Sequence, residues 1–256
     1  MAVMDDIKAE WKKMRGKPLA ERIRYFVSYY KWYVVACVAV IAVLATILVG
    51  YMLKKEPILS GIMLNSSSAS SESAYDDFSN RFLEEIGVNG KEYEVSITSN
   101  LTYLPNNEEN APNNYGTVQS LLAQTSGGLL DFMIGNLSSV QSLAYSQFFV
   151  DLSEVMSQEQ LQQLAPYICY IDLAVIEMIE AAVEAGDYEA DIPIPDCKKP
   201  EEMQRPMAAF LDVSSSDWLS EIYPYAAEPI VLAVAVNVPH KEVLLKLIDC
   251  LLQQQG

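Results

Sequence analysis

Short polar side chains follow several apolar runs of this chain, at positions where a ligand could bind. The apolar runs are typical of buried strands, and open α/β sheets bind their ligands at the carboxyl ends of strands. Hydroxyl and amide groups beside one indole would suit a neutral polar solute such as a sugar, an amino acid or a peptide. The predicted ligand-binding residues are Asn65, Ser66, Ser67, Asn136, Ser138, Ser214, Ser215 and Trp218.

A purely structural role explains the same residues. Serine and asparagine side chains cap helices and close turns, and a tryptophan is often a packing residue. Both interpretations stay open on the sequence alone.

The remaining residue patterns lack the signatures of catalysis. His240 is the only histidine, and it stands beside Lys241 and Glu242, which favours an exposed position at the start of a helix. The chain has no G-x-S-x-G turn, no P-loop and no G-x-G-x-x-G fingerprint. Adjacent acids such as Asp76 and Asp77 point about 100° apart on a helix, so they form no dyad. We therefore expect no enzyme activity, no metal and no cofactor.

The four cysteines do not make a disulfide framework. Cys37 lies in a long apolar run, which leaves an odd number, Cys169, Cys197 and Cys250, in the rest of the chain. Buried free thiols are the expected state, and a Cys169–Cys197 bridge is the alternative in an oxidising compartment.

Apolar periodicity predicts alternating strands and helices beyond residue 57. Strands are expected at residues 57–64, 93–97, 129–134, 207–213 and 230–236, and helices at residues 74–86, 115–126, 138–146, 153–164, 172–185 and 239–252. Residues 105–114 and 187–206 indicate loops. Because most of these strands are apolar nearly throughout, both faces of their sheet should be covered by helices. The expected fold class is α/β, with residues 57–256 forming one three-layer α/β domain.

An uncharged run of 21 residues, 33–53, precedes that domain. As a helix it would be about 32 Å long, enough to cross a hydrocarbon core of about 30 Å. Aromatic residues flank both of its ends, as they do at membrane interfaces. The run is too long for the apolar part of a cleaved signal peptide, and no A-x-A site follows it. We expect a single, uncleaved transmembrane helix.

Charge predicts the orientation of that helix. Residues 1–32 carry a net charge of +4, and residues 54–256 carry −21. Basic residues beside a span favour the cytoplasmic side, so residues 1–32 should be a basic cytoplasmic tail in contact with the lipid bilayer or a protein partner. The acidic domain is then extracellular. Its charge would repel phosphates, so no nucleic acid is expected as a partner.

Several motifs of the expected domain resemble the extracellular solute-binding proteins of ABC-type transporters. A helix ends at Gly127-Gly128 and leads into the strand sequence LLDFMIGN, and the sequence FVDLS follows at residues 149–153. The final strand and helix, PIVLAVAVNVPHKEVLLKLIDCLL, are similar to the return strand of that family and the helix beneath it. The similarity covers roughly residues 58–152 and 205–254. It implies one lobe of a periplasmic-binding-protein fold and a solute ligand.

The chain departs from that family where a second lobe would be inserted. Residues 153–204 read instead as two helices and an acidic loop, so the molecule resembles membrane-anchored, one-lobe relatives found in Gram-positive bacteria. Two functions follow as expectations. One is a non-catalytic, surface-exposed module that binds a small solute. The other is an envelope assembly protein that has lost its ligand and binds another membrane component.

Overall fold

The structure is a computed structural model that describes residues 18–21, 23–24, 31–52, 55–66, 72–105, 107–187 and 190–252. The chain forms two compact units, residues 1–54 and residues 55–256. Most of the predicted basic tail, and Ser67 among the predicted ligand-binding residues, lie outside the described residues.

The first unit contains one long helix, α3 (Lys31–Met52). Within the described residues, this is the one helix long and apolar enough to cross a membrane, judged by length and composition. The hydroxyl of Thr46, its polar side chain near the middle, donates to the carbonyls of Ala42 and Val43 at 3.0 and 2.8 Å. A helix in lipid must satisfy its polar groups internally in this way. The predicted helix is confirmed, while its insertion in a membrane stays a prediction.

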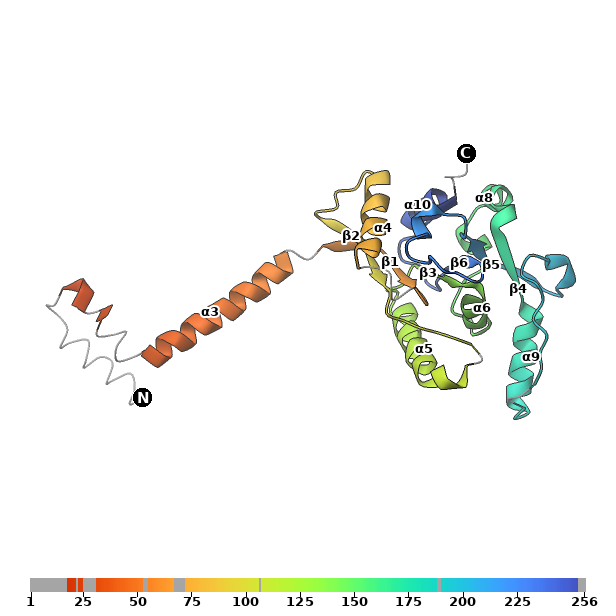
Figure 1. The fold of residues 1–256 in the computed structure, drawn as a ribbon, viewed down its shortest axis with the longest axis horizontal. Coiled ribbons are helices and arrows are strands. Elements are labelled where there is room, and N and C mark those ends of the chain that lie inside the picture. Colours follow the sequence, from red (N-terminus) through yellow and green to blue (C-terminus); the bar gives the residue numbers. More distant parts are fainter. Residues whose placement is uncertain are drawn as a thin grey trace. The chain divides into compact units, whose positions relative to one another are not determined.

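The second unit is built on one six-stranded sheet with the order β2-β1-β3-β6-β5-β4 (Figure 1). The strands are β1 (Glu56–Met63), β2 (Tyr93–Thr98), β3 (Phe132–Asn136), β4 (Ile168–Asp172), β5 (Pro206–Asp212) and β6 (Ile230–Val234). Strand β1 pairs in parallel with β2 and β3, whereas β6 is antiparallel to both β3 and β5, and β4 is antiparallel to β5. Strands β1, β2, β3 and β5 therefore run in one direction, and their carboxyl ends share one edge.

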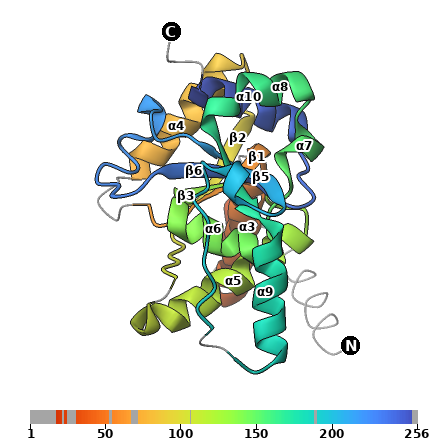
Figure 2. The ribbon, with the colours of Figure 1, turned by 90° about the vertical axis from the view of Figure 1, so that its right-hand side faces the viewer.

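Helices cover both faces of the sheet, which confirms an α/β fold with three layers (Figure 2). Helices α4 (Glu72–Glu85), α7 (Leu152–Val155), α8 (Gln158–Gln163) and α10 (Lys241–Leu252) cover one face, and α5 (Ala111–Ser126), α6 (Leu137–Tyr145) and α9 (Leu173–Glu184) cover the other.

Alternate strand residues enter two separate cores. In β6, Leu232 and Val234 pack under α10, while Val231 and Ala233 pack under α6. Burial on both faces explains why the strand sequences are apolar nearly throughout.

The structure differs from the predicted elements at three places. The strand β4 was not predicted, because its four apolar residues, 168–171, stand shortly after Pro166 and directly before Asp172, the cap of the next helix. Because β4 lies within residues 153–204, this segment contributes an edge strand to the sheet in addition to its helices and loop. The helix predicted at 153–164 is two short helices, since the Ser157 side chain starts a new one with a capping box. Helix α5 begins at Ala111, inside the predicted loop.

Candidate functional site

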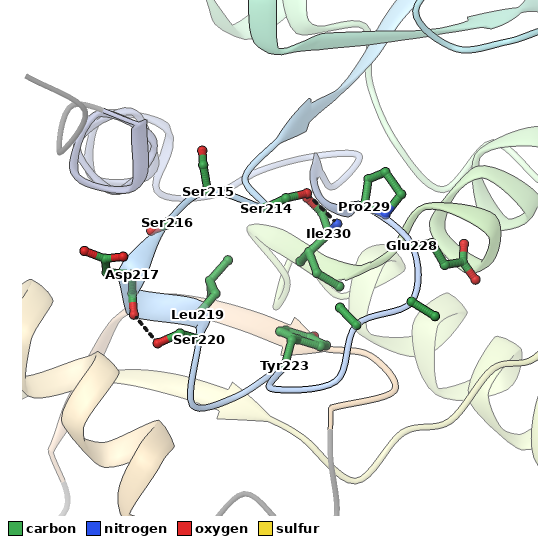
Figure 3. A pocket seen from close by; sticks show the side chains of 12 residues that line it. Ser214, Ser215, Ser216, Asp217, Leu219, Ser220, Tyr223, Glu228, Pro229 and Ile230 are labelled. Carbon is green, nitrogen blue, oxygen red and sulfur yellow. Dashed lines mark hydrogen bonds between the residues drawn. The ribbon is translucent and has the colours of Figure 1, made fainter.

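A pocket of about 470 Å³ opens at the edge of the sheet where β5 ends and β6 begins (Figure 3). The connection between these two strands supplies its walls. The lining residues are Ser214, Ser215, Ser216, Asp217, Leu219, Ser220, Tyr223, Ala226, Ala227, Glu228, Pro229 and Ile230. The predicted residues Ser214 and Ser215 thus line this pocket, just after the carboxyl end of β5.

The hydroxyl of Ser214 fixes the mouth of the pocket. Its Oγ donates to Oδ1 of Asp212 at 2.6 Å and accepts from the backbone N–H of Ile230 at 2.9 Å. This closes the last rung between β5 and β6, so Ser214 holds the wall in place as well as lining it.

Tyr223 connects the pocket to the centre of the sheet. Its hydroxyl lies 3.0 Å from the carbonyl oxygen of Leu64 and 2.9 Å from that of Ile134, at the ends of β1 and β3. Burial, and to a smaller extent the neighbouring Tyr75, raises the pKa of Tyr223 well above its ordinary value. The phenol therefore stays protonated and acts as a donor to these carbonyls.

Ser216 is the lining residue with unused hydrogen-bonding capacity. Its residue is only 5% exposed, and its Oγ has no hydrogen-bond partner within the described residues. A buried hydroxyl without a partner is costly, but this oxygen has almost no accessible surface, so a solute in the pocket as it stands does not contact it.

The charge of the pocket is negative. Asp217 and Glu228 are among its walls, and the described residues that line it include no Lys, Arg or His. The Glu228 carboxylate also accepts from the backbone N–H and the Oγ of Ser138, both at 2.9 Å, at the start of α6. A carboxylate of the chain itself thus sits where a helix N-terminus would otherwise attract an anion.

Asn65 closes a turn beyond the end of β1. It has a left-handed backbone with φ of 54°. Its amide nitrogen donates to the carbonyl of Tyr103 at 2.8 Å and to Oγ of Ser139 at 2.9 Å, and its Oδ1 accepts from the N–H of Tyr103 at 2.8 Å. These contacts favour the structural interpretation of Asn65.

Ser66 is held within the protein in the same way. Its Oγ donates to the carbonyl of Met63 at 3.0 Å and accepts from the Tyr75 hydroxyl at 2.8 Å.

Asn136 precedes α6, but its side chain makes no capping hydrogen bond to that helix. Its Oδ1 is buried and has no partner within the described residues. Of the two interpretations left open for Asn136, helix capping is therefore not what the structure shows.

Trp218 faces the core and does not line the pocket. It is 6% exposed and meets the ring of Phe78 edge-on, with centroids 6.0 Å apart. The guanidinium of Arg81 lies 4.6 Å from its centroid. This placement favours a packing role for Trp218.

A polar cluster that the sequence analysis missed lies at the opposite end of β3. Asp131 is fully buried and accepts hydrogen bonds from the backbone N–H of Ser60 at 2.7 Å and that of His240 at 2.8 Å. Nδ1 of His240 is 3.0 Å from the same carboxylate. His240 therefore has a structural role, because it joins the start of α10 to β1 and β3. The sequence carried one signal of this cluster, an aspartate at the start of an apolar strand.

No group of three metal-ligating side chains occurs among the described residues. Comparisons of the chain with protein-family models, with curated proteins and with solved structures find no match.

Proposed function

We propose that this chain is a membrane-anchored, non-catalytic binding module whose pocket between β5 and β6 takes a small polar solute. The observation that carries the proposal is a pocket of about 470 Å³ at the carboxyl edge of the sheet, lined by serines and by the carboxylates of Asp217 and Glu228. This is the edge at which open α/β sheets bind ligands, and the volume suits a small molecule.

The lining limits the chemistry of that solute. Four serines line the pocket and make it polar, while Asp217 and Glu228 supply negative charge. An anionic ligand would meet repulsion, and the described lining residues include no cation to offset it. A free amino acid would need a cation for its carboxylate, so a sugar, a polyol or an amine fits the lining better.

A domain with one lobe would bind a solute in an open pocket at its surface. The strands that the structure describes form one six-stranded sheet, so a ligand would be held by the loop of residues 213–229 instead of being enclosed between two lobes. The resemblance to extracellular solute-binding proteins is part of this proposal.

The membrane arrangement is proposed on charge and length. Helix α3 would span the bilayer, the basic N-terminal residues would face the cytoplasm, and the acidic domain would lie outside. Protease added to intact cells should remove the domain, and a label at the N-terminus should be protected. A domain released free of α3 would indicate a cleaved signal sequence instead.

Thermal unfolding of the full chain in detergent tests the binding proposal. A ligand at 100 times its dissociation constant stabilises by about 2.7 kcal/mol, which for a domain of this size is a shift of roughly 5–10 °C. Ala227→Trp, which adds a large side chain at an exposed position of the lining, should abolish the shift. Ser153→Ala, on an exposed serine outside the lining, should retain it. A flat panel with folded protein would refute the proposal.

A second function is favoured by the internal hydrogen bonds of the predicted site. Asn65, Ser66 and Ser138 are all bonded to the chain itself, as expected of a domain that has lost a ligand site and binds another envelope protein. Cross-linking in cells that recovers one consistent partner, together with a flat ligand panel, would favour this alternative.

A further inference from the structure

Cys169 and Cys197 lie side by side at the outer edge of the sheet. Cys169 belongs to the edge strand β4, and the backbone N–H of the next residue, Tyr170, donates to the carbonyl of Cys197 at 2.7 Å. One backbone hydrogen bond thus holds the segment that carries Cys197 against β4. The interaction with the other thiol is the largest influence on the pKa of each cysteine.

Both thiols are enclosed by the same apolar core. Cys169 has no exposed surface and Cys197 is 5% exposed, and they share a cluster with Ile171 and Phe210. Cys250 lies on α10, packed against the other core, and Cys37 lies in the separate unit. Among the three cysteines of residues 55–256, Cys169 and Cys197 are thus the two that share one core and a backbone hydrogen bond between their segments.

The pKa of one thiol of the pair, Cys197, is lowered by its neighbours, which include Lys198. The hydrogen bond from the Cys169 thiol, and then the ammonium group of Lys198, lower the pKa of Cys197, although burial acts against them. The hydrogen bond to Cys197, with burial, raises the pKa of Cys169. Cys197 is thus the thiol that ionises first, and its residue is 5% exposed whereas Cys169 has no exposed surface.

We propose that Cys169 and Cys197 are a site of disulfide formation that takes a small-molecule or protein disulfide as its oxidant. The Cys197 thiolate attacks one sulfur of the oxidant, which releases one thiol and leaves a mixed disulfide on Cys197. Cys169 then loses its proton and attacks Sγ of Cys197, which releases the second thiol. Two cysteine thiols and one oxidant disulfide become one protein disulfide and two small thiols.

The bond would fasten the segment around Cys197 to the sheet and stabilise the end of β5. Lys198, next to Cys197, reaches the carboxylate of Asp212 at 3.4 Å, and the carbonyl of Tyr167 at 3.3 Å. Asp212 in turn holds the Ser214 hydroxyl. A covalent anchor at Cys197 therefore supports a chain of contacts that ends at the pocket mouth.

Peptide mapping of the full chain in detergent tests the proposal. The protein is incubated with oxidised glutathione, alkylated in denaturant and cleaved after glutamate, because Glu177, Glu180 and Glu184 separate the two cysteines. We expect reactive thiols to fall from four to two, a linked pair of Cys169 and Cys197 peptides, and reversal by dithiothreitol. Recovery of both cysteines in alkylated form, or linkage of either to Cys250, would overturn the proposal.

Melting temperatures provide a second readout. The bond closes a loop of about 29 residues, so oxidation should raise the melting temperature by roughly 5–10 °C. Cys197→Ser should abolish the difference between oxidised and reduced protein, and Cys250→Ser should keep it. If Cys197→Ser does not fold, the mapping of the wild-type protein still decides the matter.

Discussion

Nδ1 of His240 lies 3.0 Å from Oδ2 of Asp131, a carboxylate whose side chain has no exposed surface. His240 donates to this carboxylate through its backbone N–H as well. A helix start and two central strands are therefore joined at one buried charge, and removal of a donor would leave that charge less well satisfied.

His240→Ala should lower the free energy of unfolding by about 1–3 kcal/mol, because a hydrogen bond to a buried charged group is lost. Asparagine can place an N–H near the position of Nδ1, so His240→Asn should recover much of the loss. Urea unfolding of the three proteins provides the measurement. Equal stability of the alanine variant and the wild type would show that the ring contributes nothing.

Gly61 lies in β1 against the fully buried ring of Phe132 on β3, and a Cβ at position 61 would overlap that ring. Gly61→Ala should therefore cost about 3 kcal/mol or more, at the upper end of overpacking effects. In a Phe132→Ala background the same change should cost far less, since the ring is absent. A double-mutant cycle by chemical denaturation tests this coupling, and additive effects would contradict it.

Asp172 predicts a pH dependence of stability. Burial acts to raise its pKa, but backbone N–H donors from Gln204, Ala174 and Arg205 outweigh burial and hold the pKa below its ordinary value. A depressed pKa in the folded state gives stability that is present above the unfolded pKa of about 3.9 and is lost as pH falls through the folded value.

Asp172→Ala should thus cost about 1–2 kcal/mol at pH 7, where the carboxylate caps α9. The difference from wild type should shrink on acidification below about pH 4. Urea unfolding at a series of pH values checks this. A difference that is constant between pH 7 and pH 3 would rule out the charged cap as its origin.

Tyr223→Phe should lower stability by about 1–2 kcal/mol, because the carbonyls of Leu64 and Ile134 lose their phenol donor. The matched control is Tyr225→Phe, two residues along the same loop, where the side chain is 87% exposed. Thermal unfolding should separate the two variants by roughly 2–8 °C. Identical melting temperatures would show that the Tyr223 hydroxyl does not hold the strands together.

The sheet could be predicted largely from sequence, since strands such as β6 are apolar on both faces and helices such as α10 have one apolar face. Strand β4 escaped because five residues between a proline and a helix cap carry too little periodicity. The site was harder. Ser214 and Ser215 were found because they follow a strand, but Tyr223 and Glu228 stand in an irregular segment, and their roles depend on contacts with residues far away in the sequence.

The most direct test of the account uses three ligands with one ring and different charge: glucosamine, glucose and glucuronate. Thermal unfolding of the wild type and of Ala227→Trp is measured against each. A polar pocket lined by carboxylates predicts that the neutral or the cationic sugar raises the wild-type melting temperature. The same account predicts that the anion does not, and that Ala227→Trp responds to none. A preference for glucuronate, or a shift that survives in Ala227→Trp, would contradict a binding site in this pocket.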